Sequence, residues 1–193
     1  MLHQRKVEIV ATDGFLLPTA ELERRGILHR KGFPDSYDAP KLMAFLEAIR
    51  AGNPTIAPKY SHILYDPLPD EQGQPIEAPD LVILEGVNTL QPEFLPYYDR
   101  TLYLHADEAD LHRWYTDRVQ RVREAVRDQP DAFLHYLAQL SDDEFTARIN
   151  RVWEEVNLKN LREHILPTKP YADLIAVKGP DHELVNLIDQ QQH

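Results

Sequence analysis

The sequence predicts an α/β protein in which helices flank a parallel sheet, and three observations favour this class. Four short runs of branched aliphatic residues are spaced along the 193-residue chain, at residues 7–12, 81–84, 101–104 and 174–177. The runs are continuously apolar, which is typical of strands that helices cover on both faces. Segments with the apolar period of amphipathic helices lie between and after these runs, so we expect strands and helices to alternate.

The helical segments carry their own start and stop signals. Asp38 precedes an amphipathic segment with an early proline, and Gly52 ends it, which predicts a capped helix. A second helix is expected from Asp107 to about Arg127, because apolar side chains recur there at helical spacing. Residues 141–144 read Ser-Asp-Asp-Glu, a capping box that predicts the start of a further long helix.

The stretch between residues 57 and 79 has a different character from the rest of the chain. A tyrosine-rich segment at residues 60–66 leads into a turn-rich segment at residues 67–74. This pattern predicts a hairpin or flap laid over the sheet edge, where loops usually carry binding residues.

Composition and charge exclude several classes of function. The 32 acidic and 21 basic residues give a formal net charge of -11, which repels nucleic acid and anionic lipid surfaces. The chain has no cysteine, so disulfides, cysteine-ligated metal sites and a thiol nucleophile are excluded. No apolar run is long enough to cross a membrane. We therefore expect a cytoplasmic protein without nucleic acid or membrane partners.

Asp13 is the first candidate for chemistry. It follows the first apolar run and precedes Gly14, which places a carboxylate at the carboxyl edge of a parallel sheet, where open α/β folds bind ligands. Phosphoryl transfer to a hydroxyl needs a carboxylate that accepts or orients the hydroxyl proton. An isolated Asp-Gly pair is more often a simple turn, so this interpretation depends on context.

Glu85 provides part of that context. The second apolar run ends in Glu85 and Gly86, the layout of an acidic residue that contacts the magnesium ion of a nucleotide, directly or through water. Two strands that each end in a carboxylate and a glycine favour a shared site. The alternative is that Glu85 caps the next helix or pairs with a lysine.

Aromatic and basic side chains supply further candidates. Tyr60 and His62 share one face of an extended segment and Tyr65 follows closely, so they can present hydrogen-bonding groups to a polar small molecule. The alternative is that these rings only pack. Arg118, in the helix after the third strand, can neutralise a phosphoryl group, but the charge pattern alone favours a solvated helix face.

Seven motifs follow one another through nearly the whole chain, and two of them are long and specific. The motifs are TDGF at residues 12–15, KGFPDSYD at 31–38, YSH at 60–62, ILEG at 83–86, WY at 114–115, NLKNL at 157–161 and ILPT at 165–168. Together they resemble the bacterial type I pantothenate kinases. The KGFPDSYD and YSH segments carry most of the resemblance.

The resemblance implies a P-loop kinase fold and the ATP- and Mg²⁺-dependent phosphorylation of pantothenate, the first step of coenzyme A biosynthesis. Asp13 would be the catalytic acid near the substrate hydroxyl, Glu85 would lie near magnesium, and Arg118 would reach the nucleotide phosphates. The family is usually a homodimer that coenzyme A inhibits, and His62 matches a position implicated in that inhibition. The side chains on the pantothenate side would be Tyr60, His62, Tyr65, Tyr115 and Asn157.

Three departures from the family pattern stand out. None of the seven glycines lies in a G-x-x-x-x-G-K-[ST] motif, so we expect the first strand and the Walker A loop to be missing from a single truncated domain over residues 1–193. Activity of this chain would then be impaired or absent. Residues 119–126 lack the aromatics and glycine of the family, which puts the apolar part of the pocket in doubt. Thr19 replaces a common asparagine, which we expect to matter less.

The expected loss of a central strand has a structural cost. Each buried backbone group left unpaired costs about 1 to 3 kcal/mol, and a central strand presents several such groups. We therefore expect the chain to re-pair its strands, to recruit a partner strand or to be marginally stable.

Two other functions remain open at this point. One is a non-catalytic pseudo-kinase that binds pantothenate or coenzyme A without nucleotide. The other is a related kinase acting on uridine or ribulose phosphate, against which the KGFPDSYD and YSH segments argue.

Overall fold

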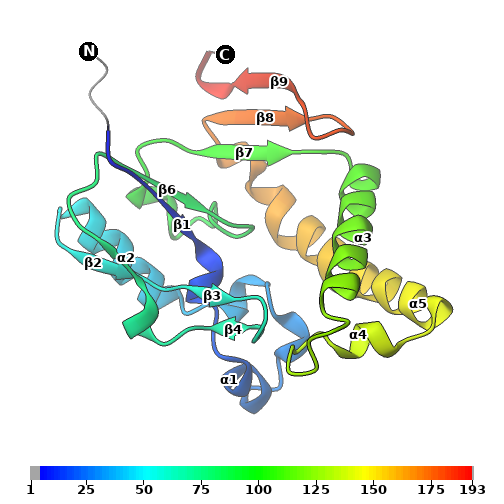
Figure 1. The fold of residues 1–193 in the computed structure, drawn as a ribbon. Coiled ribbons are helices and arrows are strands. Elements are labelled where there is room, and N and C mark those ends of the chain that lie inside the picture. Colours follow the sequence, from blue (N-terminus) through cyan, green and yellow to red (C-terminus); the bar gives the residue numbers. More distant parts are fainter. Residues whose placement is uncertain (1–4, 193) are drawn as a thin grey trace. The chain divides into compact units, whose positions relative to one another are not determined.

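The structure is a computed structural model that describes residues 5–192 (Figure 1). The chain divides into two compact units, Met1–Tyr98 and Asp99–His193, each with its own sheet and helices. The expectation of a single truncated kinase domain over the whole chain stays a prediction.

The first unit is built on a pair of parallel strands. Strand β1 (Val7–Ala11) pairs with strand β6 (Leu81–Glu85) in a continuous register that runs from Val7 opposite Leu81 to Ala11 opposite Glu85. A short 3-10 turn, Thr12–Phe15, follows β1 directly. The first two predicted strands are therefore confirmed, and they are parallel as expected.

Two small antiparallel pairs occupy the segment for which the sequence predicts a hairpin. Strand β2 (Thr55–Ala57) pairs with β5 (Gln74–Ile76), and β3 (Tyr60–Ser61) pairs with β4 (Asp66–Pro67). A 3-10 turn, Asp70–Gln72, precedes β5. The predicted hairpin is confirmed, and the inner pair β3–β4 forms its tip.

The helices of the first unit begin and end where the sequence signals lie. Helix α2 (Ala39–Arg50) starts after Asp38, whose side chain accepts a 3.0 Å hydrogen bond from the backbone nitrogen of Lys41. Gly52 follows its end with a φ of 69°, as a helix C-terminus favours. The remaining helical segments of this unit are α1 (Thr19–Arg24) and the 3-10 turns Leu28–Arg30, Pro34–Ser36 and Leu95–Tyr97.

Only one face of the β1–β6 pair is covered within this unit. Val10 is buried against Phe45 and other residues of the α2 core, with Val82 and Leu84 packed beside it. On the opposite face Ile9 is 62% exposed, and Ile83 is 43% exposed. The prediction that both faces are covered is therefore wrong for this pair, because successive side chains alternate between faces and α2 packs on one of them.

The second unit contains a three-stranded mixed sheet. Strand β7 (Leu102–His105) pairs in parallel with β8 (Leu174–Lys178), and β8 pairs antiparallel with β9 (Leu184–Asp189). Strands β7 and β8 were predicted, whereas β9 was not. Leu104 is 59% exposed, so the expectation of covered faces is wrong here as well.

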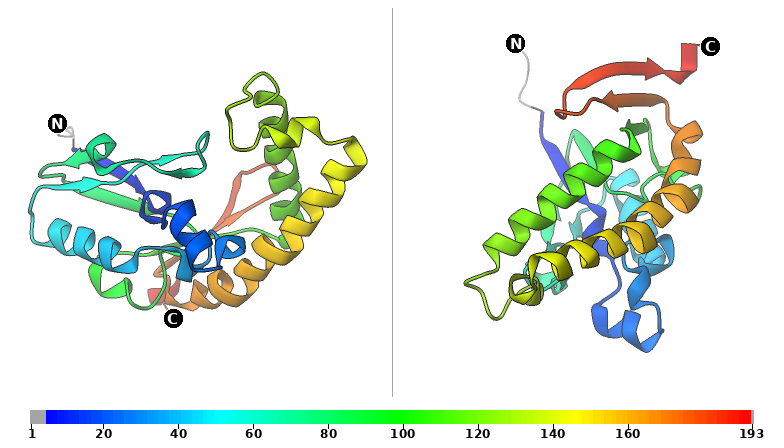
Figure 2. Two further views of the ribbon diagram at one scale, coloured as in Figure 1. Left: turned by 90° about the horizontal axis from the view of Figure 1, so that it is seen from below. Right: turned by 90° about the vertical axis from the view of Figure 1, so that its right-hand side faces the viewer.

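The helices of the second unit form a long path that Figure 2 shows in green, yellow and orange. Helix α3 (Glu108–Ala125) and a short helix α4 (Tyr136–Gln139) precede α5 (Asp142–Val152). The Ser141 capping box of α5 is present, with the Ser141 backbone nitrogen donating to Glu144 at 2.9 Å. Beyond α5 the path continues through two π-helical segments, Trp153–Leu158 and Leu161–Ile165, and ends in the 3-10 segment Leu166–Tyr171. A last 3-10 turn, Gln190–Gln192, follows β9.

The strand pairing is relevant to the expected loss of a central strand. In the described part of the chain, β6 and β7 belong to different sheets and neither sheet joins the other. Re-pairing of the strands, recruitment of a partner strand and marginal stability all stay predictions. Within residues 5–192, no helix combines the length and the apolar character that a membrane span requires.

Two glycines allow chain segments to approach the ends of β1 and β6. A Cβ atom at Gly14 would lie 2.2 Å from the carbonyl oxygen of Pro58, so the hairpin backbone passes directly over this turn. A Cβ atom at Gly86 would lie 1.7 Å from Oγ1 of Thr12, and Gly86 has a φ of 154°. Both strand ends are thus held close to their neighbours because these positions lack side chains.

We expect Gly86→Ala to lower the free energy of unfolding by about 2 to 4 kcal/mol, because it adds backbone strain to a steric clash. Gly52→Ala is the matched control, since Gly52 has a positive φ but open space around its Cβ position. That control should cost only about 1 kcal/mol. Urea denaturation followed by circular dichroism measures both, and equal losses in the two variants would contradict the close approach of Gly86 to Thr12.

Candidate active site

Asp13 and Glu85 lie at the same edge of the β1–β6 pair. Glu85 is the last residue of β6 and stands opposite Ala11, two residues before Asp13. Partial removal from water raises the pKa of the Glu85 carboxyl, and the nearby Asp13 carboxylate raises it further. The two acids that the sequence analysis selected are therefore close enough to interact, as neighbouring parallel strands require.

The Asp13 carboxylate also affects the pKa values of two tyrosine side chains near it. Burial raises the pKa of the Tyr37 phenol above its ordinary value, and the Asp13 carboxylate adds to this effect. The pKa of Tyr60 is raised by burial first, then by Tyr65 and Asp13. Asp13 is thus the common electrostatic neighbour of the strand end and the hairpin.

The hairpin brings its aromatic side chains together. The ring centroids of Tyr60 and His62 are 5.2 Å apart at 66°, and those of Tyr60 and Tyr65 are 6.3 Å apart at 74°. Tyr60 and Tyr65 are half-buried, and His62 is exposed. Two phenol groups and one imidazole can therefore offer hydrogen bonds to a polar ligand beside Asp13.

Three buried polar side chains from different segments meet near Asp13. Thr12, Tyr37 and Asn88 are all buried, and they line a cavity of about 10 Å³. The Asn88 side chain donates a 2.7 Å hydrogen bond to the backbone oxygen of Gly32. A space of this size holds about one water molecule.

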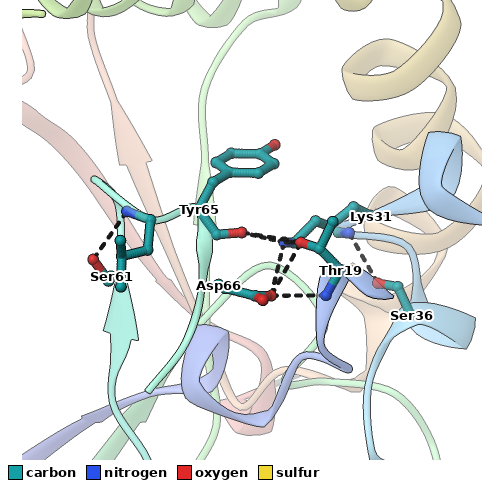
Figure 3. Close-up of polar contacts among 8 residues, drawn as sticks. Thr19, Lys31, Ser36, Ser61, Tyr65 and Asp66 are labelled. Carbon is teal, nitrogen blue, oxygen red and sulfur yellow. Dashed lines mark hydrogen bonds and ion pairs between the residues drawn. The ribbon is translucent and has the colours of Figure 1, made fainter. Parts of the chain in front are cut away.

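The structure adds three residues that the sequence analysis missed or set aside. Lys31 contacts Thr19, Tyr65 and Asp66, as Figure 3 shows. From the sequence, Lys31 and Asp66 have no predicted role, and Thr19 is expected to matter little. The available signals were the place of Lys31 at the start of the KGFPDSYD motif and the position of Asp66 directly after Tyr65.

The other predicted site residues belong to the second unit. Tyr115 and Arg118 lie on α3, and Asn157 lies half-buried in the first π-helical segment. The Tyr115 ring centroid is 5.8 Å from that of Trp153. Arg118 is exposed, as a residue on a solvated helix face would be. That these residues gather around Asp13 stays a prediction.

The carboxylates of the first unit fit the needs of a magnesium ion. Mg²⁺ prefers oxygen ligands and is usually held by one or two carboxylates, with waters and substrate phosphates completing its shell. Asp13 and Glu85 supply such a pair at one sheet edge. In the described part of the chain, no cluster of three or more acidic or histidine side chains forms an all-protein metal cage. Asp13 and Glu85 are therefore the residues of the first unit that we consider for such an ion.

Known proteins resemble this chain along most of its length. It is 45% identical over 189 residues to the pantothenate kinase of Rhizobium rhizogenes and 46% identical over 191 residues to that of a Bradyrhizobium species. These alignments cover 92% and 93% of this chain. The chain is a homologue of the pantothenate kinases. No family model matches its sequence.

This pantothenate kinase homologue spans 57% and 60% of the length of those two relatives. Among solved structures, D-glycerate 3-kinase from Cryptococcus neoformans matches 97% of the chain and 81% of its own, with a TM-score of 0.66 and 13% identity. Phosphoribulokinase from Rhodobacter spheroides matches 90% and 60%, with a TM-score of 0.60 and 12% identity. At such identities the likeness shows the fold alone, and the predicted kinase-like α/β fold is confirmed.

We expect Asp13→Asn to lower the pKa of the Glu85 carboxyl, because it removes the nearby negative charge and leaves only partial desolvation to raise that pKa above its ordinary value. Titration of the Glu85 carboxyl carbon by NMR measures the change. Asp70→Asn is the matched control, because Asp70 is exposed and pairs with Lys41. A Glu85 pKa that stays the same or rises in Asp13→Asn would contradict the proximity of the two acids.

The same shift fixes a pH dependence of stability. A raised folded-state pKa means that the folded chain binds this proton more tightly than the unfolded chain. The Glu85 contribution to the free energy of unfolding therefore falls as the pH rises from 4.5 through the folded-state pKa. The fall should be smaller in Asp13→Asn, as urea denaturation at a series of pH values will show.

Proposed function

We propose that this chain carries the hydroxyl-acceptor side of a pantothenate kinase, which transfers the γ-phosphoryl group of ATP to a hydroxyl of pantothenate. The observation that carries the proposal is the placement of Asp13 and Glu85 side by side at the end of β1 and β6, next to the aromatic hairpin. Relatives at about 45% identity that are named pantothenate kinase support this substrate.

The proposed chemistry assigns each acid a separate role. Asp13 orients the pantothenate hydroxyl and accepts its proton as the hydroxyl oxygen bonds to the γ-phosphorus; the bond from that phosphorus to the bridging oxygen breaks, and ADP leaves. Glu85 would hold Mg²⁺, which when bound neutralises charge on the phosphates. Arg118 would add a positive charge beside the nucleotide phosphates.

The proposed pantothenate contacts come from polar aromatic and amide groups. Hydroxyl, amide and carboxylate groups of the substrate need hydrogen-bond partners with a defined direction, which phenol, imidazole and carboxamide groups supply. We propose that these partners are Tyr60, His62, Tyr65, Tyr115 and Asn157.

Regulation and assembly are part of the same proposal. The exposed imidazole of His62 is a suitable contact for coenzyme A as an inhibitor, and a homodimer is the proposed assembly. None of the seven glycines lies in a phosphate-loop motif, so pantothenate binding is proposed to persist in this chain while phosphoryl transfer is slow.

Calorimetric titration of the chain with pantothenate tests substrate binding. Tyr60→Phe should weaken binding about tenfold, the usual effect of losing one hydrogen bond of about 1.4 kcal/mol. Tyr97→Phe is the control, since its hydroxyl bonds to Glu47 away from the candidate site. Absence of saturable pantothenate binding, or an equal loss in both variants, would reject the proposal.

The Asp13 role needs a test of its own. Asp13→Asn should reduce the single-turnover rate of pantothenate phosphorylation by about 10² to 10⁴-fold, the usual contribution of a general base. Parallel titrations with MgATP, coenzyme A, uridine and ribulose 5-phosphate separate the alternatives. Binding of coenzyme A without MgATP would indicate a pseudo-kinase, and preference for uridine or the sugar phosphate would indicate a different kinase.

A further inference from the structure

Lys31 is a nearly buried lysine at the centre of a polar and aromatic cluster. Its side chain is only 6% exposed. The ammonium group donates a 2.9 Å hydrogen bond to Oγ1 of Thr19 and a second hydrogen bond to the backbone oxygen of Tyr65. It also lies 3.6 Å from the carboxylate of Asp66. Figure 3 marks these contacts with dashed lines. A lysine so removed from water normally needs partners of this kind to stay charged.

The same ammonium group faces two aromatic rings. It lies 4.4 Å from the ring centroid of Tyr65 and 5.4 Å from that of Tyr60. Cation–π attraction is strongest when the cation is removed from water, as it is here. One cation therefore contributes to the orientation of both phenol rings on the hairpin.

Thr19 completes the connection between the hairpin and α1. Its backbone nitrogen and its hydroxyl donate hydrogen bonds of 2.8 and 3.0 Å to the same oxygen of Asp66. Thr19 is the first residue of α1, and Asp66 is the first residue of β4. Three segments far apart in the sequence, at Thr19, Lys31 and residues 65–66, thus meet at one cluster.

Little else in the described structure fixes the hairpin tip. Strands β3 and β4 are two residues long, and an isolated two-stranded hairpin is only marginally stable in water. Ile63 and Leu64, at the tip, are exposed. Within the tip, the side chain of Ser61 accepts one 3.1 Å hydrogen bond from the Leu64 backbone nitrogen. The tip therefore depends on contacts of its own residues with other segments of the unit.

We propose that Lys31 is a positioning residue that latches residues 60–67 to the start of α1 and so fixes the orientations of Tyr60 and Tyr65. The charge matters because a neutral amine would lose the attraction to Asp66 and to both rings. Loss of the latch should also weaken pantothenate binding, because Tyr60 and Tyr65 are proposed contacts of that substrate. This consequence rests on the proposed function, whereas the latch itself does not.

Hydrogen exchange followed by mass spectrometry tests the latch directly on the whole chain. Lys31→Met keeps an unbranched stem but removes the terminal charged group, so amides of residues 62–66 should exchange at least about tenfold faster. Amides of β1 and β6 should keep their protection. Lys41→Met is the matched control, since it removes an exposed pair with Asp70 in the same unit and should leave residues 62–66 unchanged.

Lys31→Arg separates the charge from the packing. This variant should retain more protection of residues 62–66 than Lys31→Met, because it keeps a cation beside Asp66. Equal loss in the two variants would overturn the role of the charge. Unchanged exchange at the hairpin in Lys31→Met, or uniformly faster exchange throughout residues 5–98, would overturn the latch.

Thr19→Val keeps the inference testable if Lys31→Met does not fold. It preserves shape but removes the hydroxyl that joins Lys31 to Asp66, so residues 62–66 should again exchange faster than β1 and β6. Normal protection there would count against the latch. Pantothenate titration of the wild-type chain and of the same variants then separates the two proposals. If the wild-type chain fails to bind pantothenate, the proposed function is rejected, whereas the exchange data still decide the latch.

Discussion

The parallel pairing of β1 with β6 is the constraint on which the candidate site depends. Its register puts Ala11 opposite Glu85, so the turn that carries Asp13 emerges beside the end of β6. Gly14 and Gly86 then let the hairpin and Thr12 approach the two strand ends without a side chain in the way. A shift of this register by one residue would turn the Glu85 side chain to the other face of the sheet and separate the two acids.

The local signals in the sequence predicted local structure well. Asp38 and Gly52 fixed the ends of α2, and Ser141 with Glu144 fixed the start of α5, because each acts within a few residues of its own position. Coverage of the strands was not predictable in this way. Continuous apolar runs show that side chains can be buried, but only the packing of other elements decides whether they are, as the exposure of Ile9 shows.

Two features of the second unit had no usable signal. Residues of β9 pair with β8, and their assignment depends on that neighbour more than on their own composition. The π-helical segments after α5 differ from α-helix by their hydrogen-bond pattern, which apolar periodicity does not report. In both cases the deciding information lies in contacts between segments.

The residues of the candidate site also differ in whether a local sequence signal could identify them. Asp13 and Glu85 were found because each follows a strand, and Tyr60 and His62 because alternate residues of a strand share a face. Lys31 was missed because its partners Thr19 and Tyr65 are 12 and 34 residues away, and a lone lysine in a sequence normally indicates a solvated surface. Its burial is a property of the assembled first unit.

The uncovered apolar sides of the strands have a consequence for handling the protein in solution. Ile9 and Leu104 each lie on such a side, and exposed strips of this kind attract one another between molecules. The net charge of -11 opposes that attraction by repulsion between chains. Because dissolved ions screen the repulsion but leave the apolar attraction intact, colloidal stability should decline as ionic strength increases.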